Sequence, residues 1–128
     1  MPDINNPAIF DIKYHFVWHT KFKTPILTDE VRARARKLVL QNCTQLGIKL
    51  LEGRLGRNYV YMKLSCPAHR SASEIMRLLK GRSSRLLREE FPYLKEMNLD
   101  KSMWEDGYFC ATFGDVKDEV IREYIDSL

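Results

Sequence analysis

Hydrophobic and polar residues alternate in four segments of the chain, and this period of two predicts four β-strands. The predicted strands cover residues 12–19, 48–51, 59–66 and 108–113. Gly53 and Gly56 allow a turn between the second and third strands. Pro67 ends the third, since proline cannot donate a hydrogen bond to a neighbouring strand.

Apolar residues recur at helical spacing in three further segments, which predicts three helices. The first begins after Thr28, a candidate N-cap, and ends near Gly47. The second begins after Ser71, which fits a capping box, and Pro92 ends it. The third is a C-terminal helix that opens at Asp115.

The order of the elements is β-α-β-β-α-β followed by a helix. It predicts an α+β, ferredoxin-like (RRM-like) fold, in which helices pack on one face of an antiparallel sheet. Residues 1–10 contain two prolines, two asparagines and little periodicity, and we expect them to form an N-terminal tail. A single domain is predicted over residues 11–128, because a chain of 128 residues has the size of one domain with one core.

Composition excludes a membrane protein and favours the cytoplasm. The chain is 45% hydrophobic and 30% charged, as in ordinary globular domains. No apolar run approaches the length of a membrane span, about 18 residues. No signal peptide is evident, and the three cysteines are expected to be buried free thiols in a reducing compartment. No zinc spacing, glycine-rich phosphate loop or Ser-His-Asp pattern is present.

The second predicted helix carries an unusual excess of positive charge. The net charge is only +4, but residues 77–88 contain no acid and these cations: Arg77, Lys80, Arg82, Arg85 and Arg88. Exposed helix faces usually mix both signs, although a solvated face without a ligand remains an alternative. With Ser83, whose hydroxyl could reach a phosphate, they predict a nucleic-acid-binding surface. Because residues 114–128 are acidic, a single face for a polyanion is expected.

The segment around Tyr59-Val60-Tyr61 resembles a strand of the single-tyrosine transposases of the HUH class (insertion sequence 200/605 type). That strand carries a His-hydrophobic-His motif in the family, and Tyr59 and Tyr61 stand at the two histidine positions. Further stretches resemble the family at residues 14–18, 80–92, 104–114 and 121–125. The basic helix is the most specific of these matches. Tyr124 then matches the family's nucleophile, and Leu128 stands where a glutamine usually provides a third metal ligand.

The resemblance implies a DNA-binding protein that has lost its metal site. In the family, Mg²⁺ or Mn²⁺ activates a DNA phosphate for attack by the tyrosine. Tyr59, Tyr61 and Leu128 are poor ligands, so we expect no cofactor and no catalytic activity. The expected partners are single-stranded or hairpin DNA and a second copy of the chain. Three alternatives remain open: an active transposase that uses Tyr124 with an unusual metal site or none, an RNA-binding regulator, and a structural remnant.

Each tyrosine also has a simpler interpretation. Tyr124 falls on the helix face of Val120 and Ile121, and spacing alone favours core packing there. Tyr59 and Tyr61 lie two apart on a strand, so they share one face. They could pack across strands, as aromatic residues often do. They could instead stack on bases, as aromatic pairs do on some RNA-binding sheets.

Overall fold

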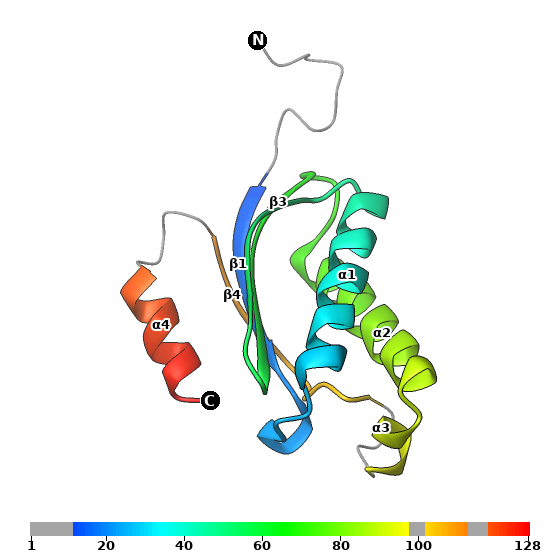
Figure 1. The fold of residues 1–128 in the computed structure, drawn as a ribbon. Coiled ribbons are helices and arrows are strands. Elements are labelled where there is room, and N and C mark those ends of the chain that lie inside the picture. The colour runs from blue at the N-terminus through cyan, green and yellow to red at the C-terminus, as the bar shows by residue number, and fades with distance from the viewer. Residues whose placement is uncertain (1–11, 98–101, 113–117) are drawn as a thin grey trace.

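The computed structural model describes residues 12–97, 102–112 and 118–128. Its elements are β1 (Ile12–His19), the short 3-10 helix η2 (Lys21–Lys23), α1 (Asp29–Gln45), β2 (Lys49–Leu55), β3 (Tyr59–Cys66), α2 (Ala72–Glu90), α3 (Tyr93–Glu96), β4 (Phe109–Thr112) and α4 (Asp118–Asp126) (Figure 1). The predicted tail at residues 1–10 and the predicted helix start at Asp115 lie outside the described residues.

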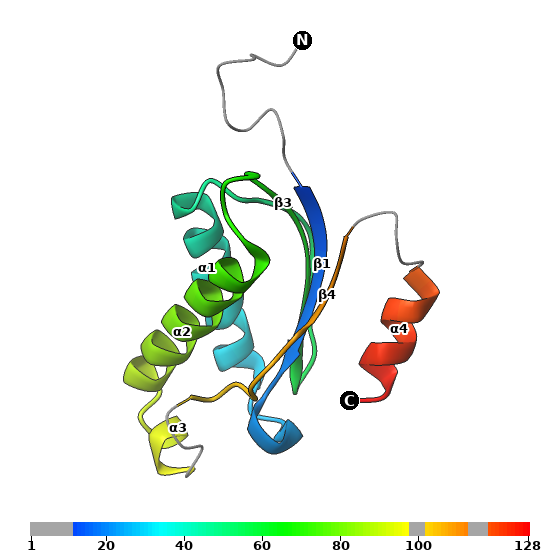
Figure 2. The same cartoon turned by 180° about the vertical axis from the view of Figure 1, so that it is seen from behind.

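The described strands form one antiparallel sheet in the order β2-β3-β1-β4. The ladder between β1 and β3 runs without a shift from Ile12 opposite Cys66 to His19 opposite Tyr59. Helices α1 and α2 lie side by side on one face of this sheet (Figures 1 and 2). The α+β, ferredoxin-like prediction is therefore confirmed.

The main core lies between the sheet and the pair α1–α2. Alternate residues of β1 and β3 point into it, among them Phe16, Trp18 and Met62, all almost fully buried. Burial of this apolar surface drives the two helices onto the sheet. At the start of α2, the Ser71 hydroxyl accepts a 3.1 Å hydrogen bond from the Glu74 backbone N–H, which confirms the predicted cap.

The opposite face of the sheet is covered by α4 (Figures 1 and 2). Ile121 is the most buried residue of this helix and packs in a second, smaller cluster with Val17 and Tyr61. The side chains of Tyr124, Ile125 and Leu128 border the same cluster. The sheet therefore carries helices on both faces, and α4 separates the second face from water.

The described helices include none that is long and apolar enough to span a bilayer. Cys43 and Cys66 are buried free thiols, as expected. Burial alone raises the pKa of Cys43 to about 12, so this thiol stays protonated. The expectation was wrong for Cys110, which is exposed on the short strand β4.

Gly56 provides the first testable prediction. A Cβ atom at this position would lie 2.1 Å from a ring carbon of Tyr59. Gly56→Ala should therefore displace the Tyr59 ring and lower the free energy of unfolding by about 1–3 kcal/mol in urea denaturation. The control is Gly81→Ala in α2, where a Cβ atom meets nothing within 4 Å. Alanine there should stabilise the helix by about 0.5–1 kcal/mol. Equal effects at both glycines would contradict this packing.

Candidate nucleic-acid interface

The tyrosines singled out by the sequence come together on the α4 side of the sheet. Tyr61 is buried in the cluster beneath α4, with Tyr59 and Tyr124 packed at its border. The ring of Tyr124 lies 4.9 Å from that of Phe109 on β4. Leu128 reaches the same cluster from the end of the chain. The positions matched to the family's ligands and nucleophile thus share one site.

A buried hydrogen bond fixes the centre of this site. Tyr61 Oη lies 3.0 Å from Nδ1 of His15, which is buried on the neighbouring strand β1. The two rings are stacked with their centroids 6.1 Å apart. Tyr61 is only 6% exposed, so its ring offers no open face to a base while α4 is in place. The structure supports the cross-strand packing interpretation for Tyr61.

A pair of substitutions tests the Tyr61–His15 contact. Tyr61→Phe removes the hydroxyl from His15 Nδ1 in a buried setting, which should lower the free energy of unfolding by about 1–3 kcal/mol. Tyr59→Phe is the matched control, because Tyr59 is half-buried and its hydroxyl has no hydrogen bond among the described residues. It should change stability by less than about 0.5 kcal/mol. Thermal and urea denaturation measure the stability of both variants. Similar losses for the two would contradict the claim that only the Tyr61 hydroxyl contributes a hydrogen bond.

The part of the chain that the structure describes holds no group of three His, Cys, Asp or Glu side chains arranged to bind a metal ion. At the positions that the resemblance assigns to ligands, Tyr61 is engaged with His15, and Leu128 packs against apolar neighbours. These residue types do not fit a divalent ion, because a tyrosine hydroxyl titrates near pH ~10 and leucine has no donor atom.

The basic helix α2 lies on the other side of the sheet from the tyrosines (Figures 1 and 2). Arg77 and Arg85 are exposed there, and Arg82 and Arg88 are partly exposed. The structure therefore places the two predicted binding elements on opposite faces of the sheet, and the basic helix lies on the face away from the acidic helix α4. The separation follows from the ferredoxin-like layers, in which α2 covers the face opposite to that of Tyr61.

Ser83 was predicted to contact nucleic acid and does not lie on the surface. It is fully buried, and its hydroxyl donates to the Leu79 carbonyl at 2.6 Å. The same oxygen accepts a 2.9 Å hydrogen bond from Trp104 Nε1. With both roles satisfied in the core, Ser83 cannot reach a phosphate. The sequence around Ser83 does not indicate this burial, because its partner Trp104 comes from a segment beyond α3.

Lys80 is also engaged with the protein. Its Nζ donates to the backbone carbonyls of Glu105 and Gly107, both at 2.8 Å. Burial lowers the pKa of Lys80, and the nearby carboxylates of Asp106 and Glu105 partly offset this effect. Lys80 thus fastens the segment before β4 to α2, which leaves its charge less available to a ligand than that of Arg77 or Arg85.

A pocket of about 370 Å³ brings further residues to the basic helix. Arg85 and Arg88 line it with Lys95, which the short helix α3 places beside them. Glu89 is the one acidic residue in this lining, and it lies 4.0 Å from Arg85. The sequence does not predict that Lys95 joins this pocket. Pro92 ends the predicted helix, and only the tertiary structure shows that the following residues pack back beside α2.

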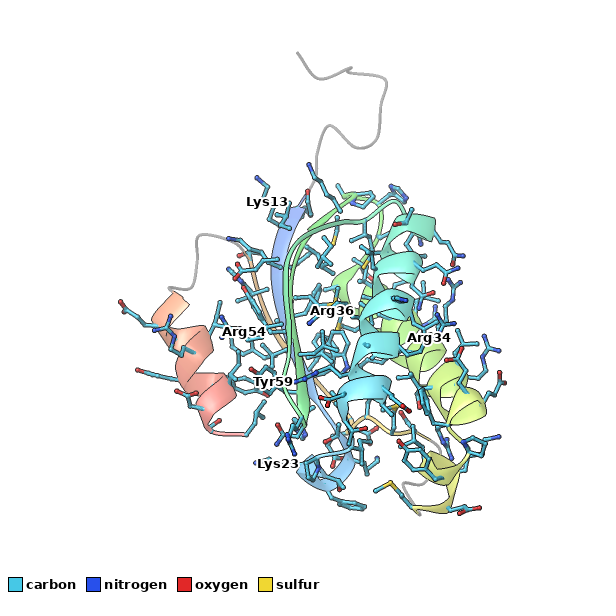
Figure 3. The ribbon with its side chains drawn as sticks, viewed as in Figure 1. Lys13, Lys23, Arg34, Arg36, Arg54 and Tyr59 are labelled. Atoms are coloured by element: carbon cyan, nitrogen blue, oxygen red, sulfur yellow. The ribbon has the colours of Figure 1, made fainter. Side chains whose placement is uncertain are left out.

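A smaller pocket of about 80 Å³ lies between α4 and the strands β2 and β3. Arg54 and Arg122 line it together with Tyr61 and Glu52. Figure 3 shows Arg54 on the α4 side of the sheet and Arg36 on the α1 side. Neither Arg54 nor Arg122 is singled out by the sequence, since the two are far apart along the chain.

Comparison with protein families matches residues 8–127 to a family described as "Transposase IS200 like". The ISDra2 transposase TnpA of Deinococcus radiodurans is 24% identical over 119 residues, which cover 93% of this chain and 85% of that protein. The transposase for insertion sequence element IS200 of Salmonella typhimurium is 30% identical over 105 residues, which cover 82% of this chain and 69% of that protein.

Two solved structures share the fold. One, from Deinococcus radiodurans and described as that of a transposase, superposes with a TM-score of 0.82 at 26% identity, over 92% of this chain and 91% of the other. The other is a REP-associated tyrosine transposase bound to a REP hairpin, with a TM-score of 0.60 at 11% identity, over 98% and 69% of the two chains. This second likeness concerns the fold alone. From the match over residues 8–127, this chain belongs to the IS200-like transposase family.

Proposed function

We propose that this transposase-family chain binds hairpin DNA with a single-stranded flank and does not cut it by the metal-dependent reaction of the family. The observation that carries the proposal is the packing of Tyr61 and Leu128 under α4, at positions where the family resemblance places metal ligands. Tyr61 Oη lies 3.0 Å from His15 Nδ1, and a neutral tyrosine hydroxyl is a poor ligand for Mg²⁺ or Mn²⁺.

The size of the catalytic loss follows from what a metal ion contributes. A divalent ion at a scissile phosphate stabilises developing charge by several kcal/mol. Each ~1.4 kcal/mol corresponds to about a tenfold change in rate. Without that ion, cleavage through Tyr124 should slow by orders of magnitude even if the tyrosine is correctly placed.

One basic pocket lies at α2 and the other beneath α4, on opposite faces of the sheet. This arrangement suggests that the hairpin stem binds at α2 and the single-stranded flank at α4. Arg77 and Arg85 are eight positions apart on α2, about 12 Å along the helix axis, and face open solvent. Such spaced cations suit the phosphates of a rigid stem. The α4 side offers only a small pocket of about 80 Å³, which a phosphate group of a flexible single strand can reach more easily than one of a rigid duplex. A tyrosine transposase with a similar fold is bound to a REP hairpin in its structure, so a hairpin is the first ligand to test.

Fluorescence anisotropy tests this function directly. A labelled DNA hairpin with a single-stranded flank should bind at low salt, and more tightly than a blunt duplex of the same length. The same sequence made as RNA tests the alternative of an RNA-binding regulator, which the burial of Tyr61 disfavours. No binding to any structured single strand at low salt would rule the function out.

We also infer a cytoplasmic homodimer, the assembly that the family resemblance implies. Light scattering on the purified protein would then give twice the monomer mass of 15.1 kDa. A mass equal to one chain at micromolar concentration would remove this part of the proposal.

A further inference from the structure

The pocket beneath α4 combines two arginines from distant parts of the chain. Arg54 belongs to β2 and Arg122 to α4, and both line the same cavity of about 80 Å³. Ile121 and Ile125 form its apolar wall, and Tyr61 contributes its ring. A cavity of this size has room for a group of a few heavy atoms.

The sheet register brings Arg54 to this pocket, and the packing of α4 on the sheet brings Arg122 to it. Arg54 stands opposite Tyr61 in the β2–β3 ladder, and opposite residues point to the same face of a sheet. Figure 3 shows Arg54 on the α4 side. Arg122 follows Ile121, which is only 4% exposed and anchors α4 to the sheet. Both arginines remain exposed at the mouth of the pocket.

Among the residues that line the pocket, two arginines outnumber one acid. The carboxylates of Glu119, Glu123 and Asp126 on α4 are not part of this lining. Within the described residues, neither Arg54 nor Arg122 takes part in an ion pair. Glu52 is the one acidic residue in the lining, and Lys63 stands opposite it in the ladder on the same face. Two guanidinium groups that are not neutralised by a carboxylate form strong, directional hydrogen bonds to phosphate oxygens.

We propose that this pocket binds one backbone phosphate of the single-stranded flank, held by Arg54 and Arg122. The inference rests on the proposed function and deepens it, because it names the group that the α4 face recognises. The positive charge comes from two side chains that line the same pocket as Tyr61, the position that the family resemblance matches to a metal ligand. The role is binding alone, and no bond in the DNA is made or broken.

Inorganic phosphate is the first probe, since it tests the pocket independently of DNA. In NMR spectra of the full chain, titration with phosphate should shift the backbone N–H signals of Tyr61 and Ile125, which line the pocket, relative to chloride at equal ionic strength. The shifts should vanish in Arg54→Gln/Arg122→Gln and persist in Arg36→Gln, which removes a charge on the α1 side. The absence of shifts at the pocket, or shifts unchanged in the double variant, would overturn the proposal.

Single-stranded DNA is the second probe. The Arg54→Gln/Arg122→Gln protein should bind the flank about tenfold more weakly, with a salt dependence reduced by about 0.7 in log–log slope, the value for one phosphate contact. Arg54→Lys/Arg122→Lys should recover part of the loss, because lysine keeps the charge but not the paired donors. A neutral methylphosphonate at one flank position should reproduce the loss in the wild-type protein and add nothing in the double glutamine variant.

The two probes separate the possible failures. A wild-type protein that binds phosphate in the pocket but no DNA would refute the proposed function and, with it, the assignment of the pocket to DNA. A wild-type protein that binds the flank with an affinity and salt slope unchanged by Arg54→Gln/Arg122→Gln would overturn the pocket alone. Circular dichroism of each variant checks that the fold is kept.

Discussion

Replacing Trp104 with alanine should lower the free energy of unfolding by about 3–5 kcal/mol, the range for large aromatic residues in a protein core. Trp104 is only 1% exposed, and its ring meets that of Trp18 edge to face at 5.9 Å. Its indole N–H is the donor to Ser83 on α2. The substitution would open a cavity between the sheet and α2 and remove this bond. Urea denaturation followed by circular dichroism measures the loss.

Phe22→Ala is the control for this prediction. Phe22 is also aromatic and close to the end of β1, but it is 71% exposed. Its removal should change the free energy of unfolding by less than about 0.5 kcal/mol. A loss below 1 kcal/mol for Trp104→Ala would show that the segment before β4 does not pack against α2 as described.

Neutralising three arginines of α2 should weaken the binding of a DNA hairpin by about a hundred- to a thousandfold near 0.1 M salt. Each phosphate contact contributes about 0.9 to the slope of log affinity against log salt on duplex DNA, or about a factor of ten at that concentration. The variant is Arg77→Gln/Arg82→Gln/Arg85→Gln, which leaves Arg88 and the structural contacts of Lys80 in place. Anisotropy titrations at several salt concentrations give both the affinity and the slope.

The control removes the same number of charges elsewhere. The control variant is Arg32→Gln/Lys37→Gln/Lys49→Gln. Two of these positions are on α1, and the third is the first residue of β2. This triple variant should lose less than tenfold in affinity, since only the general field of the protein changes. Equal losses in the two triple variants would mean that α2 attracts DNA through net charge and makes no defined contacts.

Much of the fold was predictable because alternation and helical spacing report which side chains are buried. Phe16 and Trp18 alternate with His15 and Val17, and the structure places the two pairs on opposite faces of β1. The N-cap at Ser71 is a local signal and was found at the predicted place. What the pattern could not specify is the face on which α4 lies, since Ile121 is compatible with either side of the sheet.

The candidate site was predicted less completely for a related reason. Sequence spacing correctly placed Tyr59 and Tyr61 on one face of the sheet. It could not show that the Tyr61 hydroxyl would form a hydrogen bond with His15. Ser83 was misassigned because its partner Trp104 lies 21 positions away along the chain. Arg54 and Arg122 meet only when α4 packs on the sheet. These contacts are tertiary, and no local pattern reports them.

The central claim is that this chain binds hairpin DNA without cutting it, and a covalent-adduct assay tests it most directly. The protein would be incubated with a labelled hairpin and its flank in Mg²⁺ or Mn²⁺, then separated under denaturing conditions, with Tyr124→Phe alongside. We predict a complex in native gels and no covalent adduct for either protein. An adduct that forms with the wild-type chain and disappears in Tyr124→Phe would contradict the account.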